Sequence, residues 1–545
     1  MANKKFSEFD LKTNSSDVAF VVGFNGSDNV RIAPSNLSSG GASDLNGLTD
    51  CLVDTDSLYV GEVPSNLSGN PQGNTILGID SGNALTSGNQ NTLIGNDAGK
   101  NLTTGQRNVS IGYQAGLSQT DSQAVSIGGT AGYASSTLSQ AVSIGYESNF
   151  TGLNERSIAI GYQTGYNGWS RDSVLIGERA GRAGGGLKGV HIGAQAGFNY
   201  LYGADGGVSI GYQSGYSNTS GLGNTNLGYQ AGYSNTTGAD RTIIGYEAGE
   251  FSTGAANTLL GLAAGKGVSG SSTGSYNTAI GKEAGLALTS GGQNVLMGAS
   301  AGAAITTGFR NVTLGYEAGL AMTTAYDNIL IGSQSGKSLT TNPNSSQNII
   351  LGTQAGFSAN GANGNVILGY QAAYGLTNGE TNVIIGSFAS AYSGALTTGD
   401  NNTIIGFSSY PSSATVSNEI TLGNSSISTL RCAVTSITSL SDERDKSEIK
   451  DLGYGLAFID ALQPREFVWD NRPELDKDGE EIYSANKGKK DFGFIAQEVK
   501  ELDNDTLRLV YDENPEKLEL SYGKLVPILV QAIKELKAEV ELLKS

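Results

Sequence analysis

Short apolar segments recur along most of this chain, each ending in Ile or Leu followed by glycine, from about residue 74 to residue 423. The copy from Asn108 to Gly116 reads Asn-Val-Ser-Ile-Gly-Tyr-Gln-Ala-Gly and is representative. Counted on the glycine after the Ile or Leu, the anchor glycine, there are 21 copies with a mean spacing of about 17 residues. A fixed period of this length predicts a stacked array, in which one unit cannot bury its apolar side alone.

Within each copy, Val, Ile or Thr stands three residues before the anchor glycine, and Ile or Leu (Met297 in one copy) stands one before it. Side chains alternate along an extended chain, so these two positions share a face and predict a short strand with one dry face. The position between them varies from Ser110 to Ile350. We expect that face to be wet in some coils and covered in others. The single histidine, His191, falls there and is predicted to be a surface or lateral packing residue, not a catalytic base.

Polar residues of the repeat add a second pattern. Asn stands four residues before the anchor glycine in 13 of the 21 copies, which predicts an amide ladder along one edge of the stack. The anchor glycine allows a turn with positive φ. Together these features predict a mainly β fold, a β-solenoid or β-roll rod on the order of 100 Å long if each coil rises by one strand spacing.

Composition and charge narrow the function classes. The chain has 79 Gly but only 9 Pro, which excludes collagen, and its net charge of −18 argues against binding nucleic acid or an anionic membrane. No apolar run is long enough for a membrane span, and the first residues lack the apolar core of a secretion signal, which favours a product released by lysis. Cys51 and Cys432 lie far apart without metal-ligand spacing, so neither metal nor cofactor is expected.

Four segments follow from these patterns. Residues 1–72 lack the repeat but contain strand-like stretches at 18–24 and 29–32, repeats fill 73–424, and a β linker covers 425–440. Residues 441–545 hold 41 of the chain's 84 charged residues and form a separate α+β domain. Their last stretch has apolar residues alternately three and four apart, which predicts a coiled-coil helix whose seam is too short to set the oligomeric state alone: Val526, Leu529, Ile533, Leu536, Val540 and Leu543.

The repeat resembles the head repeats of trimeric autotransporter adhesins and the shafts of phage fibres, although its period is longer than in the adhesins. The resemblance implies an elongated homotrimeric shaft. A tyrosine often follows the anchor glycine, as in Tyr113 and Tyr212. Such a row is compatible with stacking on a host glycan, but we favour a lateral contact between chains.

The C-terminal segment opens Ser441-Asp-Glu-Arg-Asp-Lys446, and later contains Leu462-Gln-Pro-Arg-Glu-Phe-Val-Trp469, Phe492-Gly-Phe-Ile-Ala-Gln-Glu-Val499 and Leu520-Ser-Tyr-Gly-Lys-Leu525. Together these phrases resemble the endosialidase-type intramolecular chaperone, a self-cleaving domain at the end of phage tail fibres and spikes. The resemblance implies that the domain trimerises the fibre, assists its folding and then cuts itself off. It makes Ser441 the nucleophile and Lys446 the general base, places the cut between Leu440 and Ser441, and gives Asp442 and Arg444 supporting roles.

Spacing adds one constraint of its own. Residues five apart point to different sides of a helix and to opposite faces of a strand, so Ser441 and Lys446 can meet only across a turn or between chains. A lysine serves as a base only where burial or a positive neighbour, for which Arg444 is a candidate, favours its neutral form.

The sequence therefore predicts a structural phage tail fibre, made in the host cytoplasm and carried on the virion. Residues 1–72 would dock to the phage particle or cap the solenoid, and the receptor would be a host cell-surface glycan or outer-membrane component. The one enzymatic activity would be autoproteolysis of its own chain. Two alternatives are a cellular trimeric adhesin, disfavoured by the missing export signal and anchor, and a glycan-degrading tail spike. The spike would need paired carboxylates, and the repeats offer scattered ones: Glu178, Glu247, Glu283 and Glu317.

Overall fold

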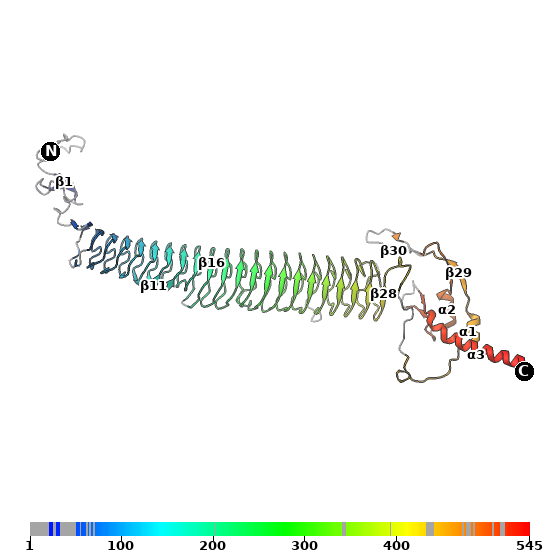
Figure 1. Ribbon diagram of the computed structural model, residues 1–545. Helices are drawn as coiled ribbons and strands as arrows, with labels where there is room; N and C mark the ends of the chain where they lie inside the picture. Colours follow the sequence, from blue (N-terminus) through cyan, green and yellow to red (C-terminus); the bar gives the residue numbers. More distant parts are fainter. Residues whose placement is uncertain are drawn as a thin grey trace. The chain divides into compact units, whose positions relative to one another are not determined.

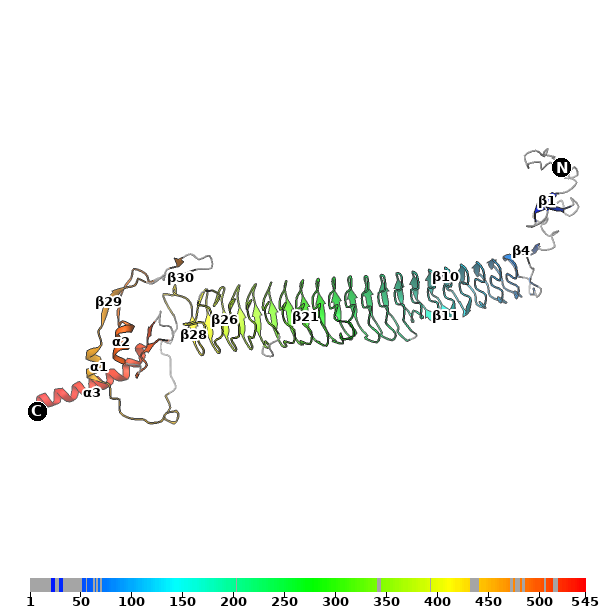
Figure 2. The same cartoon turned by 180° about the vertical axis from the view of Figure 1, so that it is seen from behind.

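A computed structural model of the chain describes residues 21–24, 29–32, 51–54, 56–61, 64, 67–68, 71–201, 203–340, 345–392, 394–431, 441–470, 474–475, 481–482, 486–503, 506–512 and 518–545. The chain divides into two compact units, Met1–Asn294 and Val295–Ser545. Each unit contains a stack of parallel β coils, so the predicted solenoid is confirmed (Figure 1; Figure 2 shows the same chain from behind). Among the described residues, no helix has the length and apolarity required to cross a membrane.

In the first unit, one short strand from each coil pairs in parallel with the strand of the next coil, without a register shift. The ladder consists of β4 (Ser57–Gly61), β5 (Thr75–Gly78), β6 (Thr92–Ile94), β7 (Val109–Ile111), β8 (Val125–Ile127), β10 (Val142–Ile144), β12 (Ile158–Ile160), β14 (Val174–Ile176), β15 (Val190–Ile192), β16 (Val208–Ile210), β17 (Thr225–Leu227), β18 (Thr242–Ile244), β19 (Thr258–Leu260) and β20 (Thr278–Ile280). A second, shorter parallel ladder joins β9 (Ala134–Thr137), β11 (Thr151–Glu155) and β13 (Ser170–Arg171).

The second unit begins with the same kind of stack. Its parallel ladder consists of β21 (Val295–Met297), β22 (Val312–Leu314), β23 (Ile329–Ile331), β24 (Ile349–Leu351), β25 (Val366–Leu368), β26 (Val383–Ile385), β27 (Thr403–Ile405) and β28 (Ile420–Leu422). Equivalent residues of successive repeats pair directly, for example Val366 with Val383. The repeat read from the sequence is therefore the structural repeat.

The prediction of which strand face points into the coil was wrong. The residue two before the anchor glycine is buried in every coil from β5 to β27, whether it is Ser110 or Ile350. The residues three and one before the glycine, predicted to be the dry face, are half-buried or exposed. The interior of the coil is narrow, since a Cβ added at Gly116 would lie 2.7 Å from Ser110 Oγ. It therefore holds the middle side chain of each strand rather than the two flanking ones. His191 sits at the inward position and is fully buried, so its predicted place at the surface was wrong.

The anchor glycine is required by both conformation and space. At Gly112, φ is +131°, and an added Cβ would lie 2.6 Å from the carbonyl oxygen of Gly128 in the next coil. An L side chain there would be strained and would push the coils apart. This explains why the residue is glycine in copy after copy.

The predicted asparagine ladder is confirmed inside both units. In the second unit, Asn365 receives the backbone N–H and the side-chain amide of Asn382 on its Oδ1, and itself donates in the same way to Asn348. Its Nδ2 also donates to the carbonyl of Gly379 at 2.9 Å. Each asparagine thus pairs buried polar groups of its own and neighbouring coils, which would otherwise cost free energy.

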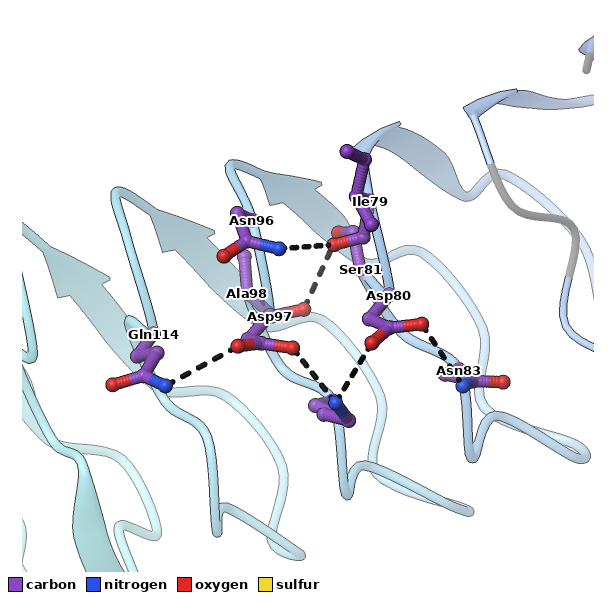
Figure 3. A network of polar contacts seen from close by, with 9 residues as sticks. Ile79, Asp80, Ser81, Asn83, Asn96, Asp97, Ala98 and Gln114 are labelled. Carbon is purple, nitrogen blue, oxygen red and sulfur yellow. Dashed lines mark hydrogen bonds and ion pairs between the residues drawn. The ribbon is translucent and has the colours of Figure 1, made fainter.

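Polar ladders also follow the outer turns of the first coils (Figure 3). Lys100 Nζ lies 2.9 Å from Asp80 and 2.8 Å from Asp97, and Gln114 donates to the other oxygen of Asp97. Hydrogen bonds from Lys100 to Asp80 and then to Asp97 raise the pKa of Lys100. The contacts from Lys100 to Asp80 and from Gln114 to Asp97 join neighbouring coils and align them along the stack, whereas Lys100 and Asp97 belong to the same coil.

Two strand pairs precede the repeats. β1 (Val21–Phe24) and β2 (Asn29–Ile32) pair antiparallel, as do β3 (Cys51–Asp54) and β4, and β4 then starts the parallel ladder with β5. Most of the segment 1–72 predicted to dock or cap lies outside the described residues. Its role stays a prediction.

The end of the second unit is a small α+β region. Its elements are a 3-10 turn (Glu443–Asp445), α1 (Leu456–Ala461), β29 (Arg465–Val468), β30 (Glu474–Leu475), β31 (Glu481–Ile482), β32 (Lys490–Gly493), α2 (Ala496–Asp503), β33 (Val510–Tyr511), β34 (Glu519–Leu520), a second 3-10 turn (Tyr522–Lys524) and α3 (Leu525–Lys544). A buried cluster of Leu462, Val499, Leu509, Leu525 and Ile528 holds the helices and hairpins together. α3 is the helix predicted from the seam.

Candidate functional site

The 3-10 turn at the start of the α+β region brings two of the predicted residues together. Lys446 Nζ lies 2.6 Å from Ser441 Oγ and 3.1 Å from the Ser441 carbonyl oxygen. The turn between them, Glu443–Asp445, reverses the chain over the five-residue spacing. The pair therefore meets across a turn within one chain, the first of the two arrangements that the spacing allowed.

Asp442 and Arg444 form the turn itself. Asp442 Oδ1 caps it by accepting the backbone N–H of Arg444 at 2.9 Å, and the guanidinium donates to both carboxylate oxygens, Nη2 at 2.7 Å. The side-chain hydrogen bonds from Arg444 lower the pKa of Asp442, and the backbone bond adds to this effect. Arg444 is ion-paired with Asp442 in this turn, and the contacts between the two residues stabilise the turn.

The pair is open to solvent in the single chain. Ser441, Asp442, Arg444 and Lys446 are all exposed. A serine needs a base to become a nucleophile, and a lysine becomes one only where its ammonium form is disfavoured. Leu440, the residue predicted to precede the cut, lies outside the described residues. The described geometry therefore holds nucleophile and base in hydrogen-bonding distance, but not the surroundings that would activate them.

The three downstream phrases singled out in the sequence contact one another. β29 of the first phrase pairs antiparallel with β32, which ends inside the second phrase. Arg465 of β29 also forms a two-pronged ion pair with Glu498 of α2. Tyr522, in the third phrase, accepts the backbone N–H of Phe494 at 3.1 Å. These residues build the scaffold of the region rather than its reactive site.

One long-range contact had no signal in the sequence. Glu535 of α3 accepts the backbone N–H of Leu456 at 2.6 Å, at the first turn of α1, and this bond lowers the pKa of Glu535. A short helix with a glycine before it gains an acceptor from a residue 79 positions away. Nothing in local spacing marks such a partner.

The scattered glutamates do not form the acid pair of a glycan hydrolase. Glu247 and Glu317 each bind a lysine, Lys266 at 2.6 Å and Lys337 at 2.7 Å. Hydrogen bonds from Lys337, and then from Gln334 and Tyr316, lower the pKa of Glu317 to about 2, the opposite of what a general acid needs.

The other two glutamates also lie beside cations in the sequence and in space. Glu178 is 3.5 Å from Arg179, and Glu283 is 3.5 Å from Lys282. Among described carboxyl groups with a clear shift, only Asp121 has a raised pKa, caused first by burial and then by the charge of Glu155. The described carboxylates therefore give the glycan-degrading alternative no support.

Part of the tyrosine row is a stack of rings. Tyr212, Tyr229 and Tyr246 lie in successive coils with ring centroids 5.3 and 4.8 Å apart and nearly parallel planes. A second stack joins Phe198, Tyr216 and Tyr233. Each inner ring has both faces covered by its neighbours, so sugars cannot stack on those faces. The rows hold coils in register.

Comparison with known proteins identifies the C-terminal region. Residues 441–508 match the Peptidase_S74 family, described as the chaperone of endosialidase. The match begins at Ser441, the first residue of the hydrogen-bonded pair. Domains of this family are autoproteolytic chaperones that act in trimers, so the match implies that this chain cleaves itself. Searches of curated proteins and of solved structures find no significant match.

Proposed function

We propose that this protein is a homotrimeric phage tail fibre whose C-terminal domain aligns the three chains and then detaches itself by cleavage between Leu440 and Ser441. The solenoid would be the shaft on the virion, residues 1–72 its docking end, and a host surface component its target. The observation that carries the proposal is the contact of 2.6 Å between Lys446 Nζ and Ser441 Oγ at the first residue of an autoproteolytic domain.

The contact supports a specific order of steps. Neutral Lys446 takes the proton of Ser441 Oγ, and the oxygen attacks the carbonyl carbon of Leu440. The peptide C–N bond breaks as the ester C–O bond forms, and the proton passes from Nζ to the released amine of Ser441. Water then hydrolyses the ester and leaves Leu440 as the new C-terminus. Ser441 supplies the nucleophile and is also the residue on the C-terminal side of the cleaved bond. One turn is therefore sufficient to hold the reacting groups.

The exposure of the pair supports a link between cleavage and assembly. In one chain, solvent reaches both side chains. Neighbouring chains that cover the turn would exclude water and favour the neutral base. Cleavage would then follow assembly and leave the finished shaft without its template.

The test is the intact mass of the purified full-length chain and of its variants. We expect the wild-type protein to separate into residues 1–440 and 441–545. Ser441→Ala removes the nucleophile and Lys446→Ala the base, so both should stay whole.

A matched control keeps the positive charge without a usable base. Lys446→Arg should assemble like the wild type and stay uncleaved, because a guanidinium does not lose its proton. Cleavage of Ser441→Ala at the same bond, or an uncleaved wild-type trimer, would contradict the proposed reaction.

A further inference from the structure

Each solenoid unit has an apolar strip on its outside, formed by the residues three and one before the anchor glycine. In every copy these two positions hold only Val, Ile, Leu, Met or Thr. In β17 and β18, for example, they are Thr225, Leu227, Thr242 and Ile244, and Leu227 is 41% exposed. The strip contains no charged residue in any coil.

The coil does not need this strip for its own core. The inward residue two before the glycine fills the interior, and it is buried next to strip residues that are not, as Ile243 is between Thr242 and Ile244. A soluble monomer rarely exposes a large apolar patch, and this strip recurs in every coil. The strip therefore has the composition of a surface that is covered in the assembled protein.

Its border has the composition of an interface rim. In most copies the residue five before the anchor glycine is polar or charged, although it is Gly or Ala in five copies. Some of these side chains pair from coil to coil, such as Arg156 with Asp172 and Arg310 with Asp327, each at 2.6 Å. An apolar centre with a polar edge is the usual arrangement of a protein–protein contact.

We propose that the occupant of the strip is the same strip on two further copies of this chain, so that the three solenoids pack around the strip residues. The inference rests on the trimeric assembly proposed above and specifies the face that it buries. Strip residues recur once per coil, and a second copy offers the same recurrence along its whole length. A glycan would need many donors and acceptors, and the strip offers only the hydroxyl groups of its Thr residues, because Val, Ile, Leu and Met side chains offer no good donor or acceptor.

Thiol labelling of the full-length protein tests the strip. Cys51 and Cys432 are first replaced by Ser. Leu227→Cys then places a thiol on the strip, and Ser220→Cys, an exposed residue between β16 and β17, places one outside it. We expect a maleimide to react about tenfold or more slowly with Leu227→Cys in the native trimer, because access requires local opening. In denaturant the two rates should be equal.

A second strip variant, Leu260→Cys, controls for a local folding defect caused by the Leu227→Cys substitution. Leu260 is 41% exposed in the single chain. Oxidation should join Leu227→Cys chains into covalent dimers and leave Ser220→Cys chains separate. If light scattering shows a trimer but both strip variants react as fast as Ser220→Cys, the proposed strip interface is wrong and the trimeric assembly remains supported. A monomeric full-length chain would overturn both.

Discussion

A neutral histidine inside a coil makes the solenoid sensitive to acid at one place. His191 is fully buried, its Nε2 lies 3.1 Å from the Gly185 carbonyl oxygen, and its ring centroid is 4.5 Å from that of Tyr200. Burial lowers the pKa of His191 to about 4, and the bond to Gly185 offsets only part of this effect. The unfolded chain, with a histidine pKa of about 6.5, binds the proton more readily.

The sign of the pH effect follows from this difference. As pH falls from about 7 to about 4, the unfolded state gains a proton that the folded state does not, so His191 should reduce local stability by about 3 kcal/mol. Below the folded pKa the loss ends. His191→Ser, which copies Ser209 of the next coil, should remove this dependence. Hydrogen exchange over residues 190–210 measures it, and equal pH profiles for the two proteins would contradict the assignment.

The asparagine ladder is the element that connects coils through their interior. It continues through Asn328, Asn348, Asn365, Asn382 and Asn402 of the second unit. In the first unit no asparagine stands at this position in six consecutive coils, from Ala124 to Gly207, and the ladder is interrupted again where Arg241 takes the asparagine position. That side chain is fully buried and donates through Nη2 to the Ser252 carbonyl, while its Nε and Nη1 have no partner among the described residues. Burial lowers the pKa of Arg241 to about 10.

Removing one rung should cost more than an ordinary surface change. Asn365→Ala leaves the backbone N–H of Asn382 and the carbonyl of Gly379 without this partner, a loss of about 1–3 kcal/mol for each buried group left unpaired. Asn378→Ala, an exposed asparagine between β25 and β26, should change stability by less than about 0.5 kcal/mol. Thermal or denaturant unfolding of both variants compares them, and equal midpoints would show that the ladder contributes nothing.

The sequence predicted the positions of the strands and helices better than it predicted which face of each strand points into the coil. The period predicted the strands and the recurring asparagine predicted the ladder. The five-residue spacing left two arrangements for Ser441 and Lys446, across a turn or between chains, and the structure shows the first. The inward face was misassigned because both faces of the strand are largely apolar, one toward the coil interior and one outward. The small residues at Ser126 and Ala159 were the available signal for a narrow interior. Partners distant in sequence, such as Leu456 and Glu535, leave no local pattern.

At the scale of the whole molecule, the α+β region offers an apolar helix face for association. Seam residues Leu529, Ile533 and Leu536 of α3 are exposed in the single chain, Ile533 by 65%, whereas Leu525 and Ile528 belong to the buried cluster. A long stack of similar coils has many equivalent registers and slow non-local pairing, so a domain that joins chains first would reduce misalignment.

Charging this seam should block assembly and cleavage together. Ile533→Asp places a carboxylate in the expected helix contact without touching the buried cluster, so the isolated domain fold should persist while chains stay apart. Light scattering would then report loss of the trimer and intact mass would report an uncut chain. As a control, Lys534→Ala changes the neighbouring residue and should leave both unaffected. Full cleavage in a monomeric Ile533→Asp protein would show that the reaction needs no partner.

The direct pairing of equivalent residues from coil to coil has a consequence for how such a protein changes over generations. Because Val366 meets Val383 as Thr75 meets Thr92, excising or duplicating one complete repeat joins two surfaces that already fit. Gaining or losing one complete repeat would therefore lengthen or shorten the stack in whole steps of about 4.8 Å. The distance that the protein spans is set by a copy number, and a lineage can adjust it without inventing a new fold.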